Sequence, residues 1–166
     1  MQTPKLKPVD FNKYKPIWVI TDGSWMGISA MYGQGANWDT CRPVGFLSNK
    51  FMSTQHNYCM HKHETLAVLE ALMKWEDKLL GRKFMVVTDH KGLECFKTQP
   101  NLSPRQTRWW EYLSCFNYNT IHVDGTQNQV ADSLSCHATT STILLRMNTP
   151  IVNLSKQMNY LIWMET

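Results

Sequence analysis

Four acidic side chains in this 166-residue chain have the type and placement to bind divalent metal ions together: Asp22, Glu64, Asp89 and Asp132. Converging carboxylates repel one another, by about 4 kcal/mol for two unit charges about 4 Å apart at an effective dielectric near 20, so a cluster of them implies bound cations. All-oxygen ligation suits a hard ion, and Mg²⁺ or Mn²⁺ fits better than Zn²⁺. Two such ions about 3.5–4 Å apart are the usual means of hydrolysing a phosphodiester. That chemistry is the prediction, provided that the fold brings the acids together.

Asp22 and Asp89 each come directly after a run of residues that favours a buried β-strand. The run at 17–20 leads into the letters TDGS, and the run at 84–87 leads into TDH. Both runs are rich in β-branched and aromatic residues. If the two strands are parallel neighbours, their carboxyl ends bring Asp22 and Asp89 to the crevice where α/β sheets place their chemistry.

Residues 62–80 change to a helical period, with apolar side chains three, four and seven positions apart. Gly81 suits the end of this helix. Glu64 begins it and shares a face with Ala67 one turn later, so the face that packs on the sheet also carries the carboxylate. A right-handed crossover to the strand at 84–88 then places the second Asp strand beside the first.

The remaining segments predict an α/β fold with a mixed sheet and helices on its faces. We expect further strands at 28–34, 44–48 and 119–123, and further helices at 91–96 and 105–115. Ser103 and Pro104 are typical of the N-cap and first turn of the last of these helices. The first three strands form an antiparallel meander.

Asp132 lies in the segment 128–135, which has the pattern of a short amphipathic helical turn. Val130 and Leu134 would dock this turn and aim Asp132 at the crevice that holds the other acids. The alternative is that Asp132 only caps its own short helix.

The other candidate ligands also have structural alternatives. Asp22 and Asp89 could each cap a turn after a strand, and Glu64 could be a solvated first-turn acid favoured by the helix dipole. His61 and His63 are two residues apart near a helix start, so they do not share a helical face. We expect both to be surface histidines rather than metal ligands.

Charge and composition set the broad class of the protein. The formal charge of +4, from 17 Lys and Arg against 13 Asp and Glu, fits a polyanionic partner without requiring one. Five scattered cysteines favour reduced thiols over disulfides or a zinc site. No stretch resembles a signal peptide or approaches the ~20 apolar residues of a membrane span, so we expect an intracellular protein, cytoplasmic or nuclear, with no membrane contact. We divide the chain into a linker (1–15), a domain (16–136) and a tail (137–166) that has no visible motif.

The motifs resemble those of a known family. The strings ITDGS, YCMHKHETLAVLEALMKWEDKLLGRKFMVVTDHKGLECF, LSPRQTRWWEYLSCF and NQVADSLS, in this order and spacing, look like the ribonuclease H domain of gypsy-type LTR retrotransposon Pol polyproteins. The resemblance covers roughly residues 16–136. It implies the RNase H fold, a five-stranded mixed sheet with three antiparallel strands, two parallel strands and flanking helices. It also implies hydrolysis of the RNA strand of RNA–DNA hybrids, two Mg²⁺ ions, and a reverse transcriptase domain upstream in the parent polyprotein.

Carried over by motif, the family's metal-binding and catalytic acids fall on the four already named: Asp22, Glu64, Asp89 and Asp132. Candidate contacts to the hybrid are Ser24, Lys91, Arg105 and Arg108. For the basic residues the alternative is a solvated helix face, with one of the tryptophans at 109–110 in the core.

The chain departs from its relatives in two places. The loop at 124–128 lacks the histidine that many cellular relatives carry there, and His122 precedes it on the expected strand. Ser133 and Cys136 replace the usual residues of the VADALSR motif. A second hypothesis is therefore a weak or inactive retroelement remnant that serves as a hybrid-binding or protein-interaction module. An integrase-type strand transferase fits less well, because those enzymes generally place their Glu last.

Overall fold

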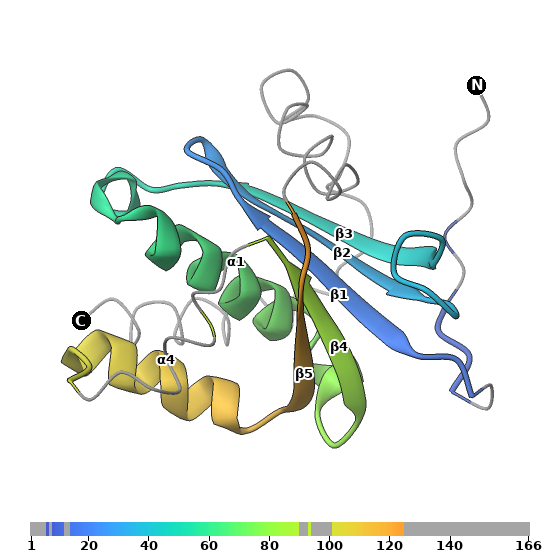
Figure 1. Cartoon of the computed structure of the whole chain (residues 1–166). Helices are drawn as coiled ribbons and strands as arrows, with labels where there is room; N and C mark the ends of the chain where they lie inside the picture. Colours follow the sequence, from blue (N-terminus) through green and yellow to red (C-terminus); the bar gives the residue numbers. More distant parts are fainter. Residues whose placement is uncertain (1–5, 7, 12–13, 90–92, 94–100, 125–166) are drawn as a thin grey trace.

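A computed structural model describes residues 6, 8–11, 14–89, 93 and 101–124. Five strands form one sheet in the order β3-β2-β1-β4-β5, with helices packed against it (Figure 1). The strands are β1 (Ile17–Gly23), β2 (Gly27–Gln34), β3 (Arg42–Lys50), β4 (Lys83–Thr88) and β5 (Asn117–His122). The helices are η1 (Gln55–Asn57), α1 (Met60–Lys74), α2 (Glu76–Leu79) and α4 (Pro104–Ser114).

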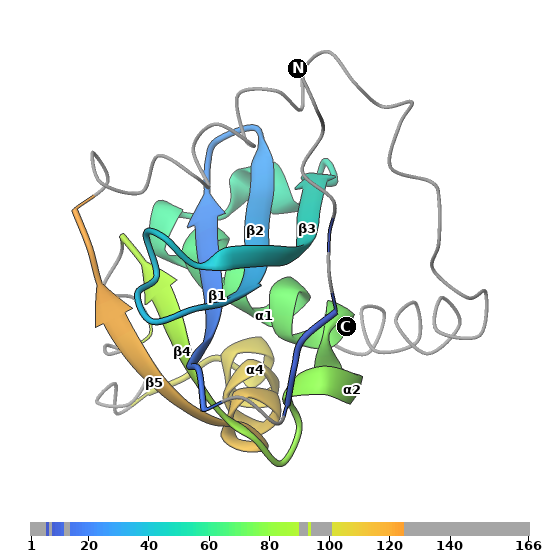
Figure 2. The same ribbon diagram turned by 90° about the vertical axis from the view of Figure 1, so that its right-hand side faces the viewer.

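The pairing of the strands confirms the predicted fold class. β1, β2 and β3 form an antiparallel meander, whereas β4 lies parallel to β1 and β5 lies parallel to β4. Val19 on β1 is level with Val86 on β4, so the two strands run together to the same edge of the sheet. Figure 2 shows β1 and β4 as neighbours in the middle of the sheet. The chain thus passes through α1 before β4, and β4 lies parallel to β1 and beside it, as predicted.

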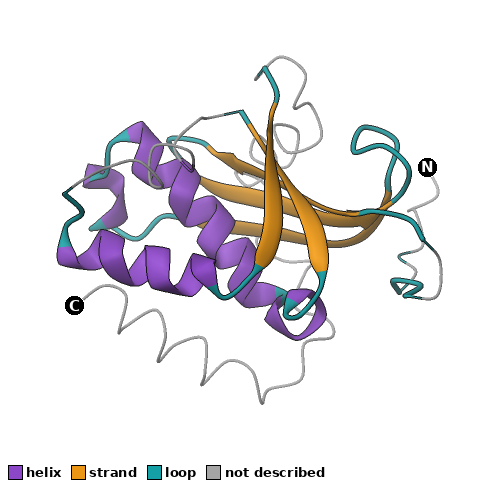
Figure 3. Ribbon diagram, turned by 60° about the horizontal axis from the view of Figure 1, so that its bottom comes forward, coloured by secondary structure: helices purple, strands orange, loops and turns teal. Residues whose placement is uncertain are grey.

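The main core lies between the sheet and the helices on one of its faces (Figure 3). Val19, Leu69, Leu72 and Val86 are among its fully buried side chains. Burying a side chain of this kind contributes about 1.5–3 kcal/mol relative to leaving it exposed. α1 packs against β1 and β2 through this core, which fixes the helix that carries Glu64 against the central strand.

A second apolar cluster occupies the other face of the sheet, where Trp18, Ile20 and Val87 are all buried. Burial on both faces explains why β1 and β4 read as continuous apolar runs instead of alternating patterns. It also explains why the sequence predicts these two strands so clearly.

The predicted helix at 62–80 is broken in the structure. α1 begins two residues earlier than expected, at Met60, and ends at Lys74. Trp75 leaves helical geometry (φ −114°, ψ 22°), and its ring stacks on Tyr32 with ring centroids 5.3 Å apart. Because this buried stacking fixes Trp75 against β2, the last turn continues as the separate helix α2. Gly81, at φ 73°, adopts the left-handed conformation that suits the predicted stop.

α4 begins as the sequence predicts. The Ser103 side chain accepts a hydrogen bond from the backbone N–H of Gln106, and the Gln106 side chain accepts one from the backbone N–H of Ser103. Pro104 occupies the first turn. This reciprocal cap satisfies two donors that a helix start leaves without partners.

The segment before β1 is anchored at the far end of the sheet from Asp22. Asp10 N–H donates to Gln34 Oε1 (3.0 Å), and Gln34 Nε2 donates to the Asp10 carbonyl (2.9 Å). A cleft of about 1000 Å³ lies here, lined by residues that include Lys15 and Arg42. This cleft is thus remote from the predicted chemistry.

Several predictions concern residues outside the described part of the chain. These are the helix at 91–96, of which only Leu93 is described, the turn at 129–135 with Asp132, Lys91, and the tail at 137–166. Among the described helices, none is long and apolar enough to cross a membrane.

Candidate metal centre

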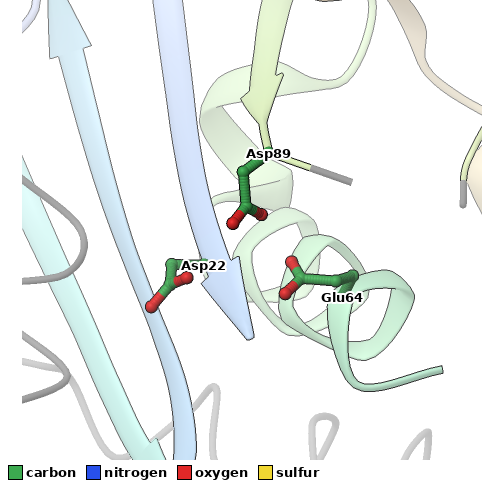
Figure 4. Close-up of side chains that lie close together, drawn as sticks. All are labelled: Asp22, Glu64 and Asp89. Carbon is green, nitrogen blue, oxygen red and sulfur yellow. The ribbon is translucent and has the colours of Figure 1, made fainter. Parts of the chain in front are cut away.

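Three of the four predicted acids converge at one edge of the sheet. Asp22 lies on β1, Asp89 directly follows β4, and Glu64 is on α1. Each offers a carboxylate oxygen, and these oxygens all lie within 4.8 Å of one another. Figure 4 shows the three side chains close together, carried by the ends of β1 and β4 and by α1. Because β1 and β4 are parallel neighbours, their ends deliver the two aspartates to the same place.

Gly23 allows α1 to approach the end of β1 closely enough for Glu64 to join the aspartates. A Cβ atom at Gly23 would lie 2.8–2.9 Å from backbone atoms of His63 and Glu64, so only glycine fits without displacing the helix. The Gly23 N–H also donates to Glu64 Oε2 at 3.1 Å. Glu64 sits in the second turn of α1, not at its start as predicted, because the helix begins at Met60.

The environment of Glu64 favours its neutral form in the absence of a cation. Burial, first, and then the nearby carboxylates of Asp89 and Asp22 raise the pKa of Glu64 from 4.5 to about 9, and the hydrogen bond from Gly23 only partly opposes this. Like charges in a partly desolvated site have this effect. A bound divalent cation would remove the penalty by replacing the proton.

The donor set fits a hard divalent cation. Asp89 Oδ1 is buried and has no hydrogen-bond partner among the described residues, which is costly for an acceptor unless something else satisfies it. Three carboxylates around one space provide oxygen ligands of the kind that Mg²⁺ and Mn²⁺ prefer. A buried acceptor without a partner, next to two further carboxylates, is the local signature of a cation site.

His63 is fully buried, so the expectation of two surface histidines is wrong for this residue. Its Nε2 lies 2.8 Å from the Gln55 carbonyl and must carry the proton to donate to it. The ring stacks on Phe51 with centroids 4.3 Å apart. The segment between β3 and α1 covers this side of the helix. The one local signal for this burial is that His63 lies one turn before Ala67, on the face predicted to pack inward. His61 is exposed, as expected.

The residues predicted to contact nucleic acid lie in several places: Ser24 in the β1–β2 turn, Arg105 and Arg108 on α4, and Lys91 outside the described residues. The Arg105 guanidinium lies 5.4 Å from the centroid of the Tyr58 ring and donates to the Tyr58 hydroxyl. Sequence reasoning missed this tyrosine, because the contact joins residues 47 positions apart. Trp109 is buried in the core, which matches the structural alternative for one of the two tryptophans.

Comparison with known proteins identifies the family. Residues 12–116 match the family described as the RNase H-like domain found in reverse transcriptase. The chain belongs to this family. Its predicted resemblance to the RNase H domain of gypsy-type retrotransposon polyproteins is thereby confirmed.

The relatives of this RNase H-like domain agree with that assignment. The Transposon Tf2-3 polyprotein of Schizosaccharomyces pombe is 32% identical over 137 residues, which cover 80% of this chain and 10% of the polyprotein. The chain therefore spans about a tenth of the length of the polyproteins that it matches.

Solved structures share the fold. The foamy viral protease–reverse transcriptase in complex with dsDNA superposes with a TM-score of 0.61 at 19% identity, over 74% of this chain and 26% of that one. LC11-RNase H1 in complex with an RNA/DNA hybrid gives a TM-score of 0.53 at 18% identity, over 75% of this chain and 99% of that one. At these identities the likeness establishes the fold.

The raised pKa of Glu64 predicts how the stability of this RNase H-like domain depends on pH without divalent cations. Between pH 4.5 and about 9 the folded protein keeps a proton on Glu64 that the unfolded chain has lost. The free energy of unfolding should therefore fall as pH rises through this window. Thermal unfolding in EDTA from pH 5 to pH 9 measures this. Mg²⁺ should raise the midpoint most at the alkaline end, and Glu64→Gln should flatten the slope in EDTA. An unchanged slope in that variant would contradict the assignment.

Proposed function

We propose that this RNase H-like domain hydrolyses the RNA strand of RNA–DNA hybrids with two divalent cations, Mg²⁺ or Mn²⁺, held by Asp22, Glu64, Asp89 and Asp132. The single observation that carries the proposal is the convergence of the first three carboxylates within 4.8 Å of one another at the edge of the sheet. Asp132 is included in this ligand set because of its sequence motif alone. We further propose that the domain acts downstream of a reverse transcriptase domain in a retrotransposon polyprotein, in keeping with its relatives.

The described residues have distinct parts in this chemistry. Cations bound between the carboxylates would activate the attacking water and stabilise the leaving oxygen. Asp22 and Asp89 supply acceptors from two strands joined by backbone pairing, which restricts how far these acceptors can separate. Glu64 supplies a third acceptor once its proton leaves, and the Gly23 N–H orients one of its oxygens. The protein thus presents ligands that are already in place before substrate arrives.

The choice of an RNA–DNA hybrid rests on several supports. The fold neighbour LC11-RNase H1 was solved with such a hybrid. The chain has a mild excess of positive charge, and Arg105 and Arg108 stand on the same helix, α4. Cationic side chains along one element suit the phosphates of a nucleic acid duplex. Ser24 and Lys91 are proposed as further contacts.

Cleavage of a labelled hybrid tests the proposal directly. The purified 166-residue chain with Mg²⁺ is expected to shorten the RNA strand of an RNA–DNA hybrid and to leave the DNA strand, single-stranded RNA and double-stranded DNA intact. EDTA should stop the reaction because the carboxylates then lack their cations. Gel electrophoresis of strands labelled at one end reports each outcome. Binding of the hybrid without cleavage at any Mg²⁺ or Mn²⁺ concentration would instead favour a non-catalytic remnant.

A further inference from the structure

Two large apolar side chains are exposed at the turn that follows Asp22. Trp25 and Met26 join β1 to β2, and 61% of Trp25 and 51% of Met26 remain open to solvent. Trp25 is three residues from Asp22, so their Cα atoms are at most about 11 Å apart even in a fully extended chain. An exposed indole therefore follows closely after one of the three clustered acids.

The turn that carries Trp25 is held firmly. The backbone N–H and the hydroxyl of Ser24 both donate to the Gly27 carbonyl, at 2.9 and 3.0 Å. At Gly27 the hairpin packs against β3 so closely that a Cβ atom would lie 2.2 Å from the Asn49 carbonyl oxygen. The backbone under Trp25 is thus tied to β2 and β3, and the ring projects from a fixed base.

One side of the Trp25 ring is supported by His56, which precedes α1, and by His63 on α1. Its centroid lies 6.4 Å from the ring of His63 in an edge-on arrangement, and 6.4 Å from the ring of His56 in a tilted one. His63 is itself buried and stacked on Phe51. These contacts orient the indole, and the exposure of 61% leaves the rest of it available to a ligand.

We propose that Trp25 is a substrate-contacting residue that packs against the sugars and base edges of the nucleic acid strand lying over the carboxylates. This inference rests on the proposed function and adds a contact that the acidic motif does not contain. Aromatic side chains bind nucleic acid by stacking on bases and sugars, largely without regard to sequence. Such a contact suits an enzyme that cleaves RNA of any base sequence.

The position of Trp25 favours this occupant over a partner protein. Trp25 follows Asp22 by three residues, and its ring lies 6.4 Å from the ring of His63, the residue before Glu64. A neutral aromatic surface in this region adds affinity without adding to the repulsion between the acids and phosphates. Because the ring is already oriented, little conformational entropy is lost when the strand binds.

Hybrid binding by a cleavage-deficient form of the full chain tests the inference. In an Asp89→Asn background with Mg²⁺, the Kd for a fluorescent RNA–DNA hybrid is measured by anisotropy. Adding Trp25→Ala should raise Kd about tenfold, and Trp25→Phe should raise it less. Trp25→Leu, which keeps apolar surface but has no aromatic face, should bind as weakly as Trp25→Ala. In the otherwise wild-type chain, the loss of cleavage caused by Trp25→Ala should fall mainly on KM.

Tyr14→Ala is the matched control, because this aromatic side chain is fully exposed just before the opposite end of β1. It should leave Kd within about twofold of the Asp89→Asn chain. A Kd for the folded Trp25→Ala variant that matches Tyr14→Ala would overturn the inference, as would failure of the Asp89→Asn chain to bind the hybrid. If the hybrid binds through Trp25 but the wild-type chain does not cut it, only the proposed catalysis fails. If the wild-type chain cuts and Trp25→Leu binds normally, only this inference fails.

Discussion

Asp89→Asn is expected to reduce cleavage of the hybrid by more than about a hundredfold, since changes to groups that merely orient a metal ligand already cost about 10–100-fold. The substitution keeps the size of the side chain but removes one negative charge and one carboxylate oxygen. Within the described part of the chain Asp89 Oδ1 is a buried acceptor without a hydrogen-bond partner, so the loss of charge falls on the carboxylate that most needs a cation. Initial cleavage rates at saturating Mg²⁺ measure the effect.

Stability separates this loss from simple unfolding. Asp89 is one of the two carboxylates that raise the pKa of Glu64, so removing its charge relieves repulsion inside the folded protein. Thermal unfolding in EDTA should therefore show Asp89→Asn to be at least as stable as the wild type. Asp77→Asn is the matched control, because Asp77 is exposed and forms an ion pair with Lys78 at 3.3 Å on α2, away from the acidic cluster. Full cleavage by Asp89→Asn would rule out this carboxylate cluster as the site.

Gly23→Ala is expected to weaken the domain and its metal site together. The new methyl group would lie 2.8–2.9 Å from backbone atoms of His63 and Glu64, and a helix backbone cannot move aside as the tip of a side chain can. Overpacking of this kind typically costs about 1–3 kcal/mol. Displacement of α1 by 1 Å would also move Glu64 relative to Asp22, and misplacement on that scale can reduce a rate about a hundredfold. Urea unfolding and hybrid cleavage measure the two effects.

Gly45→Ala provides the comparison for that experiment. A methyl group at Gly45 would meet the Trp75 side chain, with the closest atom at 3.2 Å, so a shift of a few tenths of an ångström relieves the contact. This variant should lose less stability and retain the stabilisation by Mg²⁺ that is expected for the wild type. Equal losses in both variants would mean that the close approach at Gly23 has no special part in placing Glu64.

The parts of the fold that the sequence predicts well are those with a local cause. The strands that carry Asp22 and Asp89 are buried on both faces, so they appear as uninterrupted apolar runs that end in an acid. The cap at Ser103 depends on residues only three positions apart, so the sequence predicts it equally well. The two strands that carry Asp22 and Asp89 lie side by side because a strand–helix–strand connection between parallel strands follows a right-handed crossover.

The features that sequence reasoning missed depend on long-range packing. Trp75 interrupts the predicted helix because its ring stacks on Tyr32, a residue on β2. His63 is buried because Phe51 and the carbonyl of Gln55 cover it. Helical periodicity places Ala67, one turn beyond His63, on the inner face. This spacing is the local indication that His63 is also buried. The contribution of Asp132 stays a prediction.

The parallel pairing of β1 with β4 has a mechanical consequence for the acidic site. Two of its carboxylates are attached to backbones that share one hydrogen-bonded ladder, whereas the third is on a helix joined to that ladder by apolar packing and one N–H contact. Local openings differ in free energy from one part of a fold to another. We therefore expect the distance between the two aspartates to vary less with temperature than the distance from either of them to Glu64.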